Sequence, residues 1–195
     1  MTGRHSERGV VLVEFALVAA FLCLLAFGVT EIGRAWQDKL TVQTASRAGA
    51  RVASGLTTNT AADYETLLAV RSALQDVGLS NLEYVVIYRS ATADGAVPVG
   101  CVSPAGVVTS SNTVTAKCNA YTGAQVLAMT ASQFGCGTGK LDNTWCPNTR
   151  QNLLSVGTDF LGVWIRVKHT NTTKILGNGV TKITDSSVMR LEPLT

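Results

Sequence analysis

Residues 10–29 read VVLVEFALVAAFLCLLAFGV and form the most apolar stretch of the chain. A helix needs roughly 20 apolar residues to cross the hydrocarbon core of a bilayer, which is about 30 Å thick. The stretch has this length, and Arg4 and Arg8 precede it. Because cytoplasmic flanks of spanning helices are enriched in Lys and Arg, we expect the N-terminus in the cytoplasm and the C-terminal domain outside.

Glu14 is the one charged residue within this stretch. A carboxylate in a spanning helix costs about 2.5–3.5 kcal/mol on insertion scales, and such residues commonly have a partner and a function. Its place near the start of the stretch leaves two interpretations open. Either the side chain reaches the polar interface of the bilayer, or the carboxylate is kept for a function.

The helical pattern continues beyond the apolar stretch, and no proline occurs before Pro98. A single helix over residues 10–54 would be about 67 Å long at ~1.5 Å per residue. It carries two rows with a spacing of four residues: Ile32, Trp36 and Leu40, and then Ala45, Gly49 and Ala53. Small residues let helices approach closely. The second row can therefore pack against the protein's own domain, against another subunit, or against both.

The start of the apolar stretch has the layout of a processing site. Gly9 directly precedes the stretch, Glu14 is the fifth residue after it, and Phe15 follows. At these positions the sequence resembles type IV prepilins, whose leader is cut after a glycine by a membrane-embedded prepilin peptidase. Cleavage would create a new α-amino group on Val10. The resemblance implies that Glu14 pairs with the α-amino group of a neighbouring subunit, so that neither charge stays alone in apolar surroundings.

Three segments extend the resemblance to the TadE-like proteins of tight-adherence pili. They are VEFALV at 13–18, EIGRA at 31–35 and VQTASRAGAR at 42–51, and they occur in order and without a gap. The resemblance covers about residues 9–54. It implies a membrane-anchored minor pilin (pseudopilin), not an enzyme, that has no cofactor and takes part in pilus assembly, adhesion or secretion. Its partners would be the membrane, a prepilin peptidase, other pilins of the same system and the pilus assembly platform.

The implied organisation has four parts. Residues 1–9 would be the prepilin leader, 10–30 the transmembrane helix, 31–54 its extension, and 55–195 an extracytoplasmic domain. The protein would lie in the cytoplasmic membrane as a single-pass protein, or in the pilus. The chief alternative is a single-pass anchor that holds a binding domain at the cell surface and is never assembled.

Two other export signals are alternatives to the prepilin leader. A conventional signal peptide cut after Gly28 fits the small-x-small pattern of such sites loosely, but the apolar run is long for it and contains Glu14. A lipoprotein signal would use Cys23, but Phe21 and Leu22 are too large for the positions before the cysteine.

Four of the five cysteines, Cys101, Cys118, Cys136 and Cys146, lie in the C-terminal half. In an exported domain this number predicts two disulfides and an oxidising compartment. Four cysteines allow three pairings, and we favour Cys101–Cys118 with Cys136–Cys146 because both close short loops. A zinc site would need paired C-x2-C spacings or nearby histidines, which this half lacks.

Taken together, the N-terminal segment and residues 55–195 predict a pilin-like α+β fold. It consists of the long N-terminal transmembrane and spine helix, a second helix and a small antiparallel sheet, and it is stapled by disulfides. We expect a helix over 61–77 with Thr60 as its cap, a short helix within 123–135, and strands over 82–90, 160–169 and 181–191. Residues 91–122 and 135–159 are expected to be loops, the first with short extended pieces.

Little else in the sequence points to chemistry. A net charge of +3 with scattered basic residues argues against a nucleic-acid partner. Lys140 follows a glycine-rich run, but Phe134 and Leu141 stand where a phosphate-binding loop requires Gly and Ser or Thr. The two histidines, His5 and His169, have no nucleophile beside them in sequence, and no metal site is expected.

Overall fold

The computed structural model describes residues 4–155, 157–171 and 179–193, and it describes side chains from Gly9 onwards. Helix α1 runs over Arg4–Leu56 and extends beyond the expected helix at both ends. Residues 1–3 of the expected leader lie outside the described residues. The chain divides into two compact units, one of Met1–Gln37 and Thr170–Thr181 and the other of Asp38–His169 and Lys182–Thr195. We call the latter the globular unit.

A five-stranded sheet has the order β2-β3-β1-β6-β7. Its strands are β1 (Leu82–Ser90), β2 (Ser111–Asn112), β3 (Lys117–Thr122), β6 (Phe160–Thr170) and β7 (Val180–Arg190). Central strand β1 pairs with an antiparallel strand on each side. On one side Val86 is paired with Ala120 of β3, and on the other side it is paired with Trp164 of β6. Strands β1, β6 and β7 therefore lie close to where the sequence predicts them.

The remaining elements are short. They are α2 (Ala62–Ala73), α3 (Gly123–Ala128), a two-stranded sheet of β4 (Asn152–Leu153) and β5 (Gly157–Thr158), and 3-10 turns at Leu79–Asn81, Ala131–Gln133 and Pro147–Thr149. Helix α3 starts with a capping box, because Thr122 Oγ1 accepts a hydrogen bond from Gln125 N and Gln125 Oε1 accepts one from Thr122 N.

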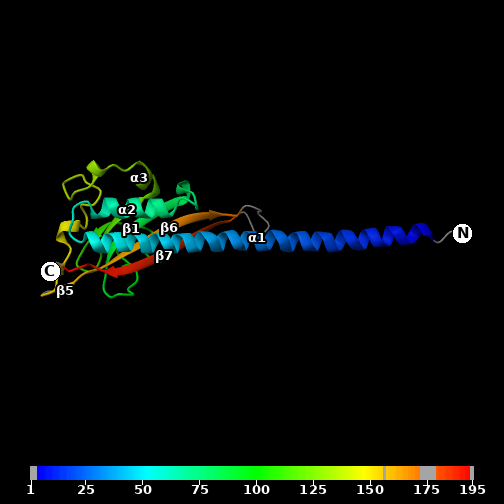
Figure 1. The fold of residues 1–195 in the computed structure, drawn as a ribbon, viewed down its shortest axis with the longest axis horizontal. Helices are drawn as coiled ribbons and strands as arrows, with labels where there is room; N and C mark the ends of the chain where they lie inside the picture. The colour runs from blue at the N-terminus through cyan, green and yellow to red at the C-terminus, as the bar shows by residue number, and fades with distance from the viewer. Residues whose placement is uncertain (1–3, 156, 172–178, 194–195) are drawn as a thin grey trace. The chain divides into compact units, whose positions relative to one another are not determined.

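Strand β1 is buried on both faces, so it separates two apolar cores. Val85 and Ile87 belong to the larger core, which also contains residues of α1, α2 and β6. Val86 and Tyr88 belong to a smaller core on the other face, together with Cys101 and Cys118. Figure 1 shows α2 beside the C-terminal part of α1. This helix-on-sheet arrangement confirms the expected α+β class.

Polar contacts fasten the C-terminal part of α1 to the end of the chain. Lys39 Nζ forms an ion pair with Asp185 Oδ1 at 3.0 Å, and Ser46 Oγ donates a hydrogen bond to Asp185 Oδ2 at 2.7 Å. Asp38 Oδ2 lies 2.6 Å from His169 Nδ1 at the end of β6. Contacts with β6 and β7 thus attach residues 38–46 of α1 to the rest of the globular unit.

Two expectations about local structure are wrong. Helix α2 ends at Ala73 rather than at residue 77, and Ala61 is its N-cap without a side-chain cap bond. In place of a Thr60 cap, Asn59 Oδ1 accepts a hydrogen bond from Ala61 N at 2.9 Å. The expected loop 91–122 does contain short extended pieces, and one of them is the six-residue strand β3, which pairs with the central strand.

Candidate functional site

The residues expected to carry processing and assembly lie on the first part of α1. Gly9, Val10, Glu14 and Phe15 are all exposed, and Phe15 is 72% exposed. A Cβ atom built on Gly9 would meet no atom within 4 Å. Since Val10 and Glu14 are four residues apart in a helix, they share one face. The structure therefore presents the expected cleavage position and the Glu14 carboxylate together on an uncovered surface of the unit that contains them.

Large apolar side chains cover this part of α1 on all sides. Those from Val10 to Val29 are about half to three-quarters exposed: Val10, Val11, Leu12, Val13, Phe15, Leu17, Val18, Phe21, Leu22, Leu24, Leu25, Phe27 and Val29. By length and composition the helix can cross a membrane. A continuous apolar surface of this size is unfavourable in water, so it marks a segment made for lipid or for other protein chains.

Glu14 makes no polar contact with any residue that the structure describes. The helix backbone offers it no donor either, because the N–H groups around it are used within the helix. A charged carboxylate in a bilayer is costly without a partner. The geometry is therefore consistent with a group whose partner lies outside this chain, as the prepilin resemblance implies.

The row of small residues is covered by the protein's own domain. Ala45 and Ala53 are fully buried, and a Cβ atom on Gly49 would lie 2.7 Å from Val70 Cγ2 of α2 and 3.3 Å from Val163 Cγ1 of β6. The row thus allows α1 to approach α2 and the sheet closely. By contrast, Ile32, Trp36 and Leu40 of the other row are 46–65% exposed.

Both disulfides of the favoured pairing are present. Cys101 and Cys118 are joined with a Cα–Cα distance of 6.2 Å, and Cys136 and Cys146 with one of 5.2 Å. The first bond ties the segment between β1 and β2 to strand β3, within the smaller core. The second bond closes a loop between α3 and β4. Cys23 is free and exposed.

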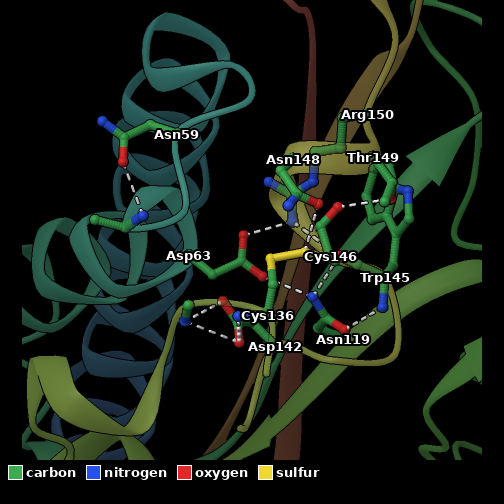
Figure 2. Close-up of a disulfide and its surroundings, with 12 residues drawn as sticks. Asn59, Asp63, Asn119, Cys136, Asp142, Trp145, Cys146, Asn148, Thr149 and Arg150 are labelled. Atoms are coloured by element: carbon green, nitrogen blue, oxygen red, sulfur yellow. Dashed lines mark hydrogen bonds and ion pairs between the residues drawn. A yellow bond between two sulfur atoms is a disulfide. The ribbon is translucent and has the colours of Figure 1, made fainter. Parts of the chain in front are cut away.

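A buried ion pair joins this second loop to α2. Asp63 and Arg150 are both fully buried in their side chains, and Arg150 Nη2 lies 2.5 Å from Asp63 Oδ1. Asp63 Oδ2 also accepts hydrogen bonds from Asn119 Nδ2 and Tyr121 Oη of β3, each at 2.7 Å. Figure 2 shows Asp63, Asn119 and Arg150 converging beside the Cys136–Cys146 bond. These three contacts, one ion pair and two hydrogen bonds to the charged carboxylate, offset the cost of removing Asp63 from water.

The disulfide loop itself is organised by main-chain contacts. Asn119 Oδ1 accepts a hydrogen bond from Trp145 N, and the Trp145 ring lies under the Arg150 guanidinium at 4.4 Å. Asp142, which is also buried, accepts hydrogen bonds from the N–H groups of Gly135 and Cys136. Sequence reasoning missed this cluster, because its members are far apart in sequence and match no motif.

Burial raises the pKa of two tyrosine side chains in the globular unit. Burial raises the pKa of Tyr121 well above its ordinary value, and the negative charge of the adjoining Asp63 raises that pKa further. Burial also raises the pKa of Tyr88. Both phenols therefore stay neutral at physiological pH and act as hydrogen-bond donors, Tyr121 to Asp63 and Tyr88 to the carbonyl oxygen of Gly95.

Over the part of the chain that the structure describes, no three or more His, Cys, Asp and Glu residues are grouped so that they could hold a metal ion. His169 contacts Asp38, as described above, and the side chain of His5 is outside the described residues.

The model of the TadE-like protein family matches this chain along α1. Residues 9–51 carry the TadE-like signature. This match confirms the resemblance expected from the sequence, and it includes Gly9, Glu14 and the whole membrane-length stretch. TadE-like proteins are structural, pilin-type proteins, and the match together with the membrane-length helix supports a pilin-like membrane protein of the tight-adherence type. No curated protein and no solved structure matches the chain significantly.

Proposed function

We propose that this chain is a minor pilin (pseudopilin) of a tight-adherence pilus. It is inserted with its N-terminus in the cytoplasm, cut after Gly9 by a prepilin peptidase, and transferred from the membrane into a pilus by an assembly platform. The proposed parts are a leader over 1–9, a spanning helix over 10–30, its extension over 31–54, and an extracytoplasmic domain over 55–195. The observation that carries the proposal is the TadE-like match over residues 9–51, in which Gly9 directly precedes the exposed apolar stretch of α1.

Glu14 is the proposed assembly residue. It lies on the same helix face as Val10 and has no polar partner among the described residues of its own chain. In an assembly its carboxylate would meet the α-amino group of Val10 from a neighbouring subunit. This pairing would neutralise two charges that are each costly alone in apolar surroundings, and it would set the axial register of one helix against the next. Phe15 would pack beside this pair.

The first test is the N-terminal residue of the protein isolated from its native membranes. The proposal requires a start at Val10. A start at Val29 would indicate an ordinary signal peptide that removes Glu14. An intact N-terminus in cells with an active prepilin peptidase would leave only a membrane anchor, and the pilin function would be rejected.

A second test separates an assembled pilin from an anchored surface domain that is never assembled. Glu14→Ala should abolish incorporation into sheared pili while the protein still accumulates in the membrane. Glu65→Ala, which removes an exposed carboxylate on α2, is the matched control and should be incorporated normally. Equal recovery of both variants in the pilus fraction would overturn the assembly role of Glu14.

A further inference from the structure

A cavity opens at one end of the sheet in the globular unit. It has a volume of about 460 Å³ and lies where β1 ends and β6 begins, with Ser90 and Phe160 paired across the two strands. The tip of the β2–β3 hairpin and strand β5 complete its wall. Ligand pockets of proteins have volumes of about 300–1,000 Å³, so one or two small rings fit in this space.

Arg89 is the cationic group of this cavity, and it is already oriented. Its Nε atom forms an ion pair with Asp159 Oδ1 at 2.8 Å, and the Asp159 side chain is only 8% exposed. The N–H of Gln151 donates a hydrogen bond to Asp159 Oδ2 at 2.9 Å, which fixes the carboxylate in turn. The Arg89 side chain remains 41% exposed, and its Nη atoms make no polar contact with the described residues. The ion pair with Asp159 thus orients the Arg89 guanidinium so that two parallel N–H groups point toward solvent.

A second guanidinium adds positive charge at the wall. Arg190 Nε donates a hydrogen bond to Thr158 Oγ1, and Thr158 lines the cavity. Arg190 does not itself line the cavity, but with Arg89 it brings two positive charges to this region against the single negative charge of Asp159. The balance favours a ligand with a negative charge.

The rim combines apolar carbon with hydroxyl groups. Val114 is 85% exposed although it lines the cavity, and Phe160 is partly exposed beside it. Thr115 and Thr158 contribute hydroxyls. The hairpin tip that carries Val114 is fixed, because Thr113 Oγ1 accepts a hydrogen bond from Ala116 N at 3.0 Å. This bond and the Arg89–Asp159 ion pair restrain two parts of the wall before a ligand binds, and such preorganisation lowers the entropy cost of binding.

We propose that this cavity binds an acidic sugar. The Nη edge of Arg89 would hold the carboxylate through paired charge-assisted hydrogen bonds, the Thr115 and Thr158 hydroxyls would contact the sugar hydroxyls, and Val114 and Phe160 would cover the C–H face of the ring. The inference does not depend on whether the chain is assembled into a filament, since every residue that carries it lies in the globular unit.

The experiment uses the full chain in nanodiscs, because sugar-based detergents would compete for the site. Glucuronic acid is the probe and glucose is its matched neutral partner, which carries a hydroxymethyl group in place of the carboxylate. Binding is measured by ligand-observed NMR titration. We expect saturable binding of glucuronic acid and binding of glucose that is about tenfold weaker or less, because charge-assisted hydrogen bonds contribute more than neutral ones.

Two variants connect the binding to the cavity. Arg89→Gln should weaken binding of glucuronic acid about tenfold or more, but it also leaves the buried Asp159 without its ion pair. Val114→Glu therefore provides a second variant, since it places a negative charge at an exposed rim position and should repel the probe without disturbing the fold. Val107→Glu, at a position that is 60% exposed and does not line the cavity, is its control and should bind normally.

The proposal is overturned if glucuronic acid does not bind, if glucose binds as tightly, or if folded Arg89→Gln and Val114→Glu proteins both bind like the unaltered chain. The C-terminus of a peptide also carries a carboxylate that could bind Arg89, so a short apolar peptide with a free C-terminus is tested as a second ligand. If this peptide binds more tightly than glucuronic acid, the cavity recognises peptide C-termini and the assignment to an acidic sugar is wrong.

Discussion

Glu14 and Asp63 both lie among apolar residues, but their carboxylates have opposite surroundings. Asp63 is fully buried and contacts Arg150, Asn119 and Tyr121 of its own chain. Glu14 is exposed on α1 and has no polar contact with the described residues. The same chemical group is thus satisfied internally in the globular unit and left unsatisfied in the membrane-length segment.

The comparison separates a structural charge from a functional one. A carboxylate whose hydrogen bonds are all made within the chain contributes to stability and specificity of the fold. A carboxylate that is costly in its segment and has no partner there is expected to act through another molecule. Substitutions in the two regions should therefore differ in kind, with effects on unfolding in the globular unit and effects on assembly in the apolar helix.

The largest expected effect is that of Asp63→Ala. Removal of the carboxylate leaves the Arg150 guanidinium buried without its counter-ion, which typically costs about 3–5 kcal/mol. We expect this loss in the free energy of unfolding, measured by urea denaturation with the fluorescence of the buried Trp145. Glu14→Ala should leave the same unfolding curve unchanged.

The double variant Asp63→Ala with Arg150→Met tests the reason for this loss. It removes both charges, so we expect it to recover part of the stability that Asp63→Ala loses. A single variant that costs less than about 1 kcal/mol would contradict the structural role assigned to Asp63.

The second prediction compares two glycines of α1. Gly49→Val introduces side-chain atoms where even a Cβ would lie 2.7 Å from Val70 Cγ2, so we expect overpacking to cost about 1–3 kcal/mol of unfolding free energy. Gly33→Val makes the same chemical change where a Cβ would meet nothing within 4 Å. Because both variants change helix propensity equally, the difference between their thermal unfolding curves reports packing alone. Equal curves would show that the small-residue row is not required for close approach.

The third prediction concerns alkaline pH. The pKa of Tyr121 is raised in the folded protein, so the folded state keeps a proton that the unfolded state loses above about pH 10. This contribution to stability is complete below that pH and falls as pH rises, by at most about 1.4 kcal/mol per pH unit for one group. Tyr121→Phe should reduce the slope between pH 10 and 11.5 in urea titrations. Some slope should remain, since the pKa of Tyr88 is raised too. An unchanged slope would contradict the prediction.

The smallest expected effect is at the end of α1. Thr57 has a φ of +47°, a conformation that a β-branched residue adopts at a cost. Thr57→Gly should raise the unfolding free energy by roughly 0.5–1 kcal/mol, because glycine is the preferred residue at such helix ends. The neighbouring substitution Thr58→Gly changes the same residue type without a positive φ, and we expect it to be neutral or destabilising. A loss of stability in Thr57→Gly would show that the threonine side chain stabilises the turn.

The sequence predicts those parts of the fold whose signals are local. Strands β1 and β6 are apolar runs with β-branched and aromatic residues, and the helical pattern over residues 10–54 contains no proline. Strand β3 escaped prediction because its sequence, KCNAYT, is short and half polar and follows a segment rich in Gly, Pro and Thr. Its buried Asn119 is favourable only because Asp63 and Trp145 supply partners from elsewhere in the fold.

The same distinction applies to the candidate site. Gly9, Glu14 and Phe15 could be selected because their spacing is fixed along one helix. The Asp63–Arg150 pair joins residues that are 87 positions apart in sequence, and the residues next to each of them form no pattern that predicts the contact. The cavity around Arg89 likewise draws on β1, β5, β6 and the β2–β3 hairpin, so only the folded chain brings its lining together.

The contacts that hold α1 in the globular unit also impose an order of folding. Asp38, Lys39 and Ser46 bind residues that follow them by 131, 146 and 139 positions. The helix is synthesised first, whereas its partners in β6 and β7 are synthesised last. Until those strands arrive, the face of α1 that carries Ala45, Gly49 and Ala53 is covered incompletely, and such long-range contacts form slowly. A chain exported during synthesis must therefore keep this face from unwanted partners for almost the whole time that the domain takes to emerge.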